Sequence, residues 1–266
     1  MKLKSFTETV LAAIADLSEH GFDSISRLER WQLELTYAAE RESQSNNAVD
    51  ARLVDHLGRI YAQQITRGGA LKRHKIAAWR LENISPKLRN ELDRRIMAAA
   101  QLIRLNRAAM IQKTLQRFSG WATSLPIDGS LAVDKRDEAE NIKKSFRSLP
   151  FEERRVIVDQ SHKLKASIDD IIAKDNGAIA GIWRCRHTGN YTNRKDHLDR
   201  ENKVYFVRDN WALRDGFAKL AGRQYMDEIT MPAQEVYCSC VYVWIYAVRD
   251  LPEECWTAKA REVMAK

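Results

Sequence analysis

The chain has 266 residues, of which 44% are apolar and 30% charged, and its formal net charge at pH 7 is +8. This composition excludes a disordered chain, and the length allows a buried core without disulfide support. No apolar run reaches the roughly 18 residues that a membrane-spanning helix needs, and the first residues lack the apolar core of a signal peptide. We therefore expect no membrane partner, and we expect the four cysteines to be thiols in a reducing compartment.

The positive charge is concentrated in one central stretch. Residues 1–66 contain 7 Lys and Arg against 10 Asp and Glu, whereas residues 67–117 contain 13 against 3. Such a stretch favours an acidic partner, with nucleic acid first among the candidates. The alternative is an ordinary solvated surface, because the basic residues scatter around the expected helix instead of following one line. The candidate contacts with nucleic acid or a protein partner are Lys72, Arg73, Lys75, Arg94, Arg104 and Arg107.

The first two thirds of the chain are predicted to be helical. Ser5 and Glu8 match the capping box of a helix start, and Gly21 is an expected helix stop. Ser85-Pro86 predicts the start of a long central helix that extends to about Phe118. Its apolar stripe at helical spacing consists of Leu88, Leu92, Ile96, Ala99 and Ile103.

The segment from Gly120 to Asp134 contains proline, glycine and small residues, so it is predicted to be a linker or surface loop. A polar helix is expected to follow, up to about Ser148. Another helix is expected from Pro150 to Asp175, where Asn176-Gly177 ends it.

Beyond Gly177 the spacing of apolar residues changes from the period of a helix to that of a strand. Three apolar runs, 178–183, 203–207 and 236–248, are predicted strands. The third run is apolar on both faces, which predicts a central strand with Cys238 and Cys240 projecting from the same side. Pro252 is expected to begin a short closing helix.

These elements predict an α+β protein. A mainly helical N-terminal portion with a long central helix precedes a small C-terminal domain with a short β-sheet. We divide the chain into a helical region at 1–119, a linker or surface loop at 120–134 and a helix-plus-sheet domain at 135–266.

Cysteine and histidine gather near the C-terminus. Cys238 and Cys240, with His197 and either Cys185 or His187, reach the four ligands that zinc requires. Cys-x-Cys is a weaker metal signal than paired Cys-x-x-Cys, and free cysteine is among the most commonly buried residues. The sequence therefore favours buried cysteines beside a hydrogen-bonded histidine and no cofactor. Zinc held by Cys185, His197, Cys238 and Cys240 is the alternative.

The same residues raise the question of catalysis. A thiolate beside a histidine is an activated nucleophile, and Asp196-His197 near a metal would suit a nuclease. However, the sequence contains no glycine-rich phosphate loop, no nucleophile elbow and no HExxH. Burial of a cysteine in a strand would also raise its pKa. We therefore expect no enzyme and no catalytic residue.

The C-terminal third resembles the phage Mu protein F-like family of head morphogenesis (minor capsid) proteins. The resemblance covers roughly residues 70–256 and is most specific over 183–240. It rests on Trp183, on Arg194-x-x-His197 before the run at 203–207, on Trp211-Ala212, and on Pro232 before Cys238-x-Cys240. Versions from short-tailed phages are matched by further segments: 84–86, 105–107, 118–124, 159–163 and 177–183.

The resemblance implies that the domain at 135–266 is Mu F-like, and that its characteristic positions are Trp183, Arg194, His197, Cys238 and Cys240. It implies a non-enzymatic minor head protein of the virion, near the portal, present in the host cytoplasm during assembly. Its expected partners are portal protein, capsid or scaffolding protein and double-stranded DNA. The alternative is a DNA-binding or metal-dependent nuclease-like phage protein.

The chain departs from the family pattern at two positions. Asn202 stands where a glycine is usual, which is tolerable because asparagine also accepts positive φ. Ser239 replaces an arginine often found between the two cysteines, so no charge is available there.

Overall fold

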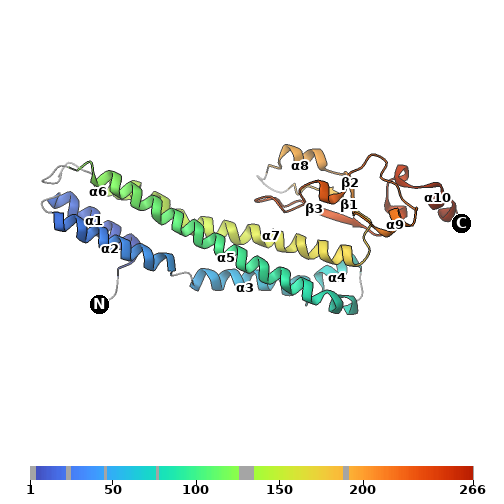
Figure 1. Cartoon of the computed structure of the whole chain (residues 1–266), viewed down its shortest axis with the longest axis horizontal. Coiled ribbons are helices and arrows are strands. Elements are labelled where there is room, and N and C mark those ends of the chain that lie inside the picture. Colours follow the sequence, from blue (N-terminus) through green and yellow to red (C-terminus); the bar gives the residue numbers. More distant parts are fainter. Residues whose placement is uncertain are drawn as a thin grey trace. The chain divides into compact units, whose positions relative to one another are not determined.

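The computed structural model describes residues 4–21, 25–44, 47–75, 78–125, 135–187 and 192–265. Helices dominate, and a small antiparallel sheet lies near the C-terminus, so the predicted α+β class is confirmed (Figure 1). None of the helices in these ranges is long and apolar enough to cross a membrane.

The helices and strands follow the order of the sequence. The α-helices are α1 (Phe6–His20), α2 (Ile25–Gln44), α3 (Asn47–Gln64), α4 (Gly69–His74), α5 (Ala78–Ala122), α6 (Lys135–Arg147), α7 (Leu149–Asp175), α8 (Lys195–Arg200), α9 (Trp211–Arg214) and α10 (Ala258–Met264). The strands are β1 (Ala180–Arg184), β2 (Val204–Phe206) and β3 (Val241–Ile245), and the 3-10 turns are η1 (Met226–Glu228), η2 (Val248–Asp250) and η3 (Glu253–Cys255).

The chain forms two compact units. Unit 1 consists of Met1–Val54 and Met97–Ile157, and unit 2 of Asp55–Ile96 and Val158–Lys266. This division differs from the predicted regions 1–119, 120–134 and 135–266, because α5 and α7 each contribute to both units. Of the predicted linker, the first residues up to Ala122 belong to α5, and residues 126–134 lie outside the described residues.

Unit 1 is built on α1, which begins as the sequence predicts. The Ser5 backbone N–H donates to Glu8 Oε2 (2.7 Å), and the Glu8 backbone N–H donates to Ser5 Oγ (3.3 Å). Gly21 then ends the helix with a φ of 60°. The helix packs against α2 and α6. The apolar core of the unit includes Phe6, Ile14, Leu17, Trp31, Leu35, Ile111, Phe118 and Ile142.

The long central helix starts earlier than Ser85-Pro86 predicts. α5 begins at Ala78, so Pro86 lies inside the helix and Phe118 is not its end. Pro86 removes one backbone hydrogen bond. Ile84 and Leu88, on either side of it, are both fully buried, so packing on the same face continues through the proline. This burial explains why the local start signal does not begin the helix.

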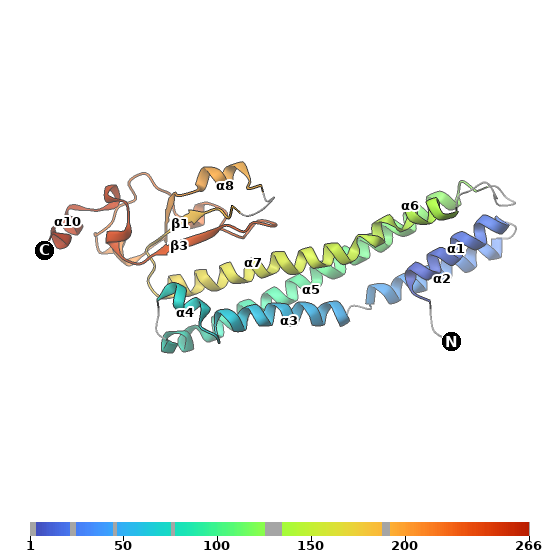
Figure 2. The ribbon, with the colours of Figure 1, turned by 180° about the vertical axis from the view of Figure 1, so that it is seen from behind.

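Unit 2 contains the sheet, whose strand order is β2-β1-β3 with both pairs antiparallel. Figure 2 shows β1 and β3 side by side. β1 therefore occupies the centre, and the prediction that the last apolar run forms the central strand is wrong. β3 covers only Val241–Ile245 of that run, and its Val241 and Val243 side chains are exposed. Cys238 and Cys240 precede the strand instead of lying on it.

The two faces of the sheet pack on different clusters. Ile182 and Val204 are cross-strand partners on the face that packs with α9 and α10 residues. Trp183 pairs with Tyr242 on the opposite face, which also holds Tyr205 and three of the cysteines. The second face therefore positions the cysteine and histidine residues singled out from the sequence.

Candidate functional site

Four chemically distinctive side chains converge on one buried point of unit 2. Cys185 directly follows β1, His197 lies on α8, and Cys238 and Cys240 precede β3. His197 Nδ1 is 3.6 Å from Cys238 Sγ and 3.6 Å from Cys240 Sγ. Cys240 Sγ is 3.6 Å from Cys185 Sγ, and all four residues are buried. The structure therefore brings the ligand atoms of His197, Cys238 and Cys240 within 4.8 Å of one another, with Cys185 beside Cys240.

The backbone before β3 turns the two cysteines of Cys-x-Cys toward one point. Tyr237 adopts a φ of 60°, and its backbone N–H donates to Asp159 Oδ1 on α7 (2.7 Å). Ala233, with a φ of 62°, donates its backbone N–H to Cys238 Sγ (3.2 Å). These left-handed residues break the extended geometry that the sequence predicts, since a regular strand would hold the two side chains farther apart.

His197 is held so that its two ring nitrogens face different environments. Nδ1 faces the sulfurs, whereas Nε2 lies 3.5 Å from Glu235 Oε1 and 3.8 Å from Asp196 Oδ2. Nε2 is buried and has no hydrogen-bond partner among the described residues. Arg194 forms an ion pair with Glu235 (3.2 Å) and donates to the carbonyl of Val236 (2.9 Å), which fixes the carboxylate near the ring.

The Trp183 side chain packs against the cluster of cysteines and His197. Its ring meets that of His197 edge-on at a centroid distance of 5.3 Å, and the Arg200 guanidinium lies 5.2 Å from the indole centroid. Tyr242 packs against the same indole at 5.8 Å. The five positions that carry the family resemblance, Trp183, Arg194, His197, Cys238 and Cys240, thus belong to one connected set of contacts.

The two neighbouring thiols differ in acidity. The hydrogen bond from Cys240 lowers the pKa of Cys238, and burial opposes this effect only in part. The same interaction, together with burial, raises the pKa of Cys240. The cluster thus favours a thiolate at Cys238 that accepts hydrogen bonds from its neighbours.

His187, the alternative fourth ligand, is not part of the cluster. It is exposed, and its Nε2 lies 2.9 Å from the Glu201 carboxylate. In the same part of the chain, Arg200 pairs with Asp196 (3.1 Å). Asn202 has a φ of 65°, so it occupies a left-handed position that asparagine accepts.

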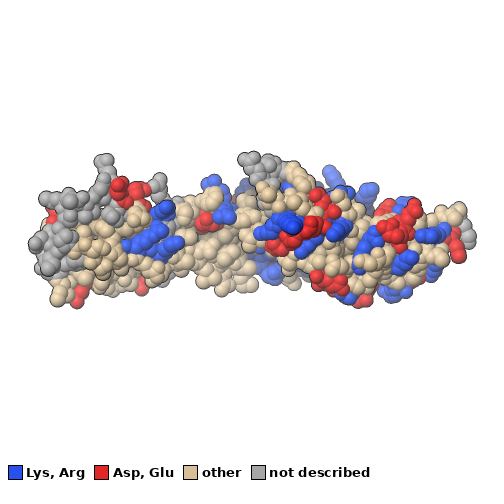
Figure 3. Space-filling model, turned by 90° about the horizontal axis from the view of Figure 1, so that it is seen from above, with Lys and Arg blue, Asp and Glu red and all other residues tan. Residues whose placement is uncertain are grey.

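Most of the basic contact candidates have acidic neighbours. Arg73 pairs with Asp169, Arg94 with Glu91 and Arg104 with Asp50. Lys72 and Lys75 are exposed on and just after α4. Figure 3 shows basic and acidic side chains interspersed on the visible face of the sheet-containing region, instead of a field of one sign.

Arg107 requires a correction. It is buried between Glu42 and Glu153, which lie 2.8 and 2.6 Å from its guanidinium nitrogens. An arginine enclosed in this way cannot reach a phosphate, so Arg107 is not a contact residue. The remaining five candidates are divided between the two units.

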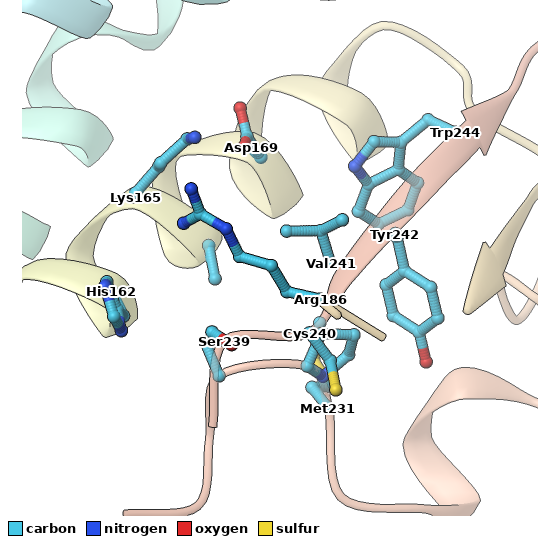
Figure 4. A pocket seen from close by; sticks show the side chains of 13 residues that line it. His162, Lys165, Asp169, Arg186, Met231, Ser239, Cys240, Val241, Tyr242 and Trp244 are labelled. Atoms are coloured by element: carbon cyan, nitrogen blue, oxygen red, sulfur yellow. The ribbon is translucent and has the colours of Figure 1, made fainter. Parts of the chain in front are cut away.

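A cavity of about 60 Å³ lies beside the cluster, between α7 and the start of β3 (Figure 4). Cys240 and Tyr242 line one side, and the Arg186 side chain extends from the sheet side toward Lys165 and Asp169 of α7. The sequence matched the segment 159–163 of α7 to the family but did not indicate that α7 lies beside the cysteines.

Glu235 is a residue of the site that sequence reasoning missed. It precedes Cys238 by three positions in a segment with no regular period, and only the fold places it beside His197. Comparisons with models of protein families, with curated proteins and with solved structures gave no match to this chain.

Proposed function

We propose that this chain is a minor head protein of a tailed bacteriophage. In this role it resides in the virion head near the portal, associates with portal, capsid or scaffolding protein, and supports procapsid assembly or DNA packaging and delivery. During assembly it acts in the host cytoplasm. The proposal assigns no catalytic residue.

One observation carries the proposal. The positions that make the chain resemble Mu protein F-like proteins lie far apart in sequence, yet Trp183, His197, Cys238 and Cys240 pack into one buried cluster and Arg194 anchors its edge. A chance resemblance of separate short motifs would not be expected to converge in this way. The burial of the cluster favours a bracing role over catalysis, because a substrate needs access.

Unit 1 offers apolar surface for a protein partner. On α2, Leu33 and Tyr37 lie one turn apart and are both more than half exposed, and Ile25 is 80% exposed. On α5, Met97 and Leu105 are exposed as well. Exposed apolar side chains of this kind typically mark contacts with other proteins. We therefore assign portal or capsid contact to the helical unit, and sheet bracing to unit 2.

The test in the virus is a stop codon in this gene in the phage or prophage that encodes it. The expected result is a strong loss of infectious particles, restored by the gene supplied in trans, with the chain detected in purified heads by quantitative mass spectrometry. Purified infectious heads that lack the chain would contradict the proposal.

The contact surface is tested by co-purification with the portal protein of the same phage. Leu33→Glu and Tyr37→Glu are expected to reduce recovery, whereas Gln32→Glu, an equally acidic change at an exposed neighbour on α2, is expected to leave it unchanged. Equal recovery of all three variants would remove α2 from the contact surface.

The nuclease alternative is tested by incubating the purified chain with double-stranded DNA and zinc, magnesium or manganese. We expect no cleavage. Cleavage that is lost in His197→Gln would favour the alternative over the structural role.

A further inference from the structure

The spacing of His197, Cys238 and Cys240 matches three corners of a tetrahedron around a metal ion, and Cys185 lies next to Cys240. With Zn–S bonds of about 2.3 Å and Zn–N bonds of about 2.0 Å, two ligand sulfurs lie about 3.8 Å apart and a sulfur and a nitrogen about 3.5 Å apart. Both S···N distances from His197 and the Cys185–Cys240 S···S distance are 3.6 Å. The ligand atoms of His197, Cys238 and Cys240 all lie within 4.8 Å of one another. Three edges of the tetrahedron are therefore already formed.

The surroundings of the two ring nitrogens of His197 also favour a bound metal ion. A single Nδ1 faces two sulfurs at once, at 3.6 Å from each, which is the arrangement of one nitrogen and two sulfurs around a shared metal ion. With a metal on Nδ1, the ring proton must reside on Nε2. That proton then points to Glu235 Oε1 at 3.5 Å, the carboxylate partner that metal-bound histidines usually have.

One further contact suits a bound thiolate, since the Ala233 backbone N–H donates to Cys238 Sγ. The Cys185 thiol donates to the His197 carbonyl oxygen (3.2 Å), a hydrogen bond that it would give up on binding a metal as a thiolate. The cluster is sealed, since His197, Cys238 and Cys240 are each 1% exposed. Four protein ligands would leave no open coordination position for a reacting water, which is typical of structural metal sites.

We propose that Cys185, His197 (through Nδ1), Cys238 and Cys240 bind one structural Zn²⁺ ion. Three thiolates and one imidazole form a soft donor set that favours zinc over magnesium or calcium. The ion joins the end of β1, α8 and the irregular segment before β3, where regular secondary structure is scarce. This site is independent of the proposed virion role, because it concerns how unit 2 is held together in any setting.

The first experiment is elemental analysis of the full chain, freed of any histidine tag and purified without chelator. We expect about one zinc per chain, the stoichiometry of a single structural site. X-ray absorption at the zinc edge of this wild-type sample is expected to show three sulfur ligands and one nitrogen ligand. A reduced chain that neither contains zinc nor binds added zinc would overturn the proposal. Zinc held mainly by nitrogen and oxygen would do the same.

The second experiment uses variants with a matched control. Cys185→Ser, Cys238→Ser and Cys240→Ser are each expected to lower the zinc content strongly. Cys255→Ser replaces the fourth buried cysteine, which lies in the core on the opposite face of the sheet, and is expected to retain zinc. Equal zinc loss in Cys255→Ser would show that the loss follows general destabilisation and would count against the assigned ligands.

Two measurements do not depend on the folding of ligand variants. Glu235→Gln is expected to weaken zinc affinity about tenfold without changing stoichiometry, as for other carboxylates behind a ligating histidine; the exposed Glu254→Gln is its control. The denatured wild-type chain is expected to show four free thiols. A disulfide between Cys185 and Cys240 in the purified chain would exclude the site.

Discussion

Arg107 donates two hydrogen bonds to Glu153 Oε1, at 3.1 Å from Nε and 2.6 Å from the guanidinium NH2 group, in the interior of unit 1. Its third contact is to Glu42 Oε1 at 2.8 Å. Both Arg107 and Glu153 are less than a tenth exposed. This pair joins α5 to α7 where the sequence predicts only a basic surface residue.

Replacement of Arg107 is therefore expected to destabilise the folded protein strongly. Arg107→Ala leaves the Glu153 carboxylate buried without its partner, and should lower the free energy of unfolding by about 3–5 kcal/mol. Arg104→Ala, one turn earlier on α5, removes a more exposed pair with Asp50 and should cost under about 1 kcal/mol. Urea unfolding followed by circular dichroism measures both. If Arg107→Ala lowered the free energy of unfolding as little as Arg104→Ala, the buried Arg107–Glu153 pair would contribute little to stability.

A second prediction concerns acid stability of unit 2. Burial alone would raise the pKa of Asp169, but hydrogen bonds from His74 and Arg73 outweigh it and hold that pKa below the ordinary 3.8. The folded state then binds this proton less tightly than the unfolded state. Ionised Asp169 therefore stabilises the folded state fully at pH values above the ordinary pKa of a carboxyl group. This stabilisation is lost as the pH falls through the lower pKa that Asp169 has in the folded state. Asp169→Asn should therefore flatten the decline of stability at acid pH.

Asp170 provides the opposite case on the next residue. Burial raises the pKa of Asp170 above its ordinary value, although Lys174 opposes the shift. The contribution of Asp170 to the stability of the folded state is therefore present at low pH, where its carboxyl group is protonated. It is lost as the pH rises through the raised pKa that Asp170 has in the folded state. Asp170→Asn should improve stability near neutral pH relative to acid, in contrast to Asp169→Asn. Melting temperatures measured from pH 3 to pH 7 (about the range in which carboxyl groups titrate) compare the two variants; profiles of the same shape would refute this assignment.

A third prediction concerns the close packing behind Trp183. A Cβ atom on Gly181 would lie 2.8 Å from Met226 Cε and 3.0 Å from the Tyr242 ring. Gly181→Ala should therefore overpack this face of the sheet and cost about 1–3 kcal/mol. In α3 of the same unit, a Cβ on Gly58 would meet nothing within 4 Å. Gly58→Ala should stabilise the helix by about 0.5–1 kcal/mol, so thermal melts should shift in opposite directions.

The left-handed turn before β2 gives a fourth prediction. Asn202 has a φ of 65°, a conformation that β-branched residues adopt only with strain. Asn202→Gly should be nearly neutral, whereas Asn202→Val should destabilise unit 2 by about 1–3 kcal/mol. Unfolding of both variants tests this ordering, and a valine variant as stable as the glycine variant would refute it.

The sequence predicted those parts of the fold that depend on local signals. The capping box at Ser5, the stop at Gly21 and the end of α7 at Gly177 were all read correctly, because backbone hydrogen bonding at helix ends depends on the residues nearby. The same local reasoning failed at Pro86. There, burial of Ile84 and Leu88 against the rest of unit 2 decided that the helix continues.

The candidate site shows the same division. Residue types and their order indicated that His197 and the two cysteines of Cys-x-Cys could meet, with Cys185 as a fourth member. Glu235, beside the imidazole, had no recognisable pattern, and the segment 159–163 was matched without any sign that Asp159 accepts from the Tyr237 backbone, because partners far apart in the chain become neighbours only through the fold.

By itself, the sequence determined the α+β class, the order of helices and strands, and the set of residues able to form the cluster, since these follow from hydrophobic period and residue chemistry. The tertiary structure alone decided that β1 and not β3 is the central strand, and that Arg107 is buried. It also decided that His197 Nδ1 lies 3.6 Å from the sulfurs of Cys238 and Cys240, and that Cys240 Sγ lies 3.6 Å from Cys185 Sγ. These outcomes depend on long-range packing, in which burial of whole side chains outweighs local preferences.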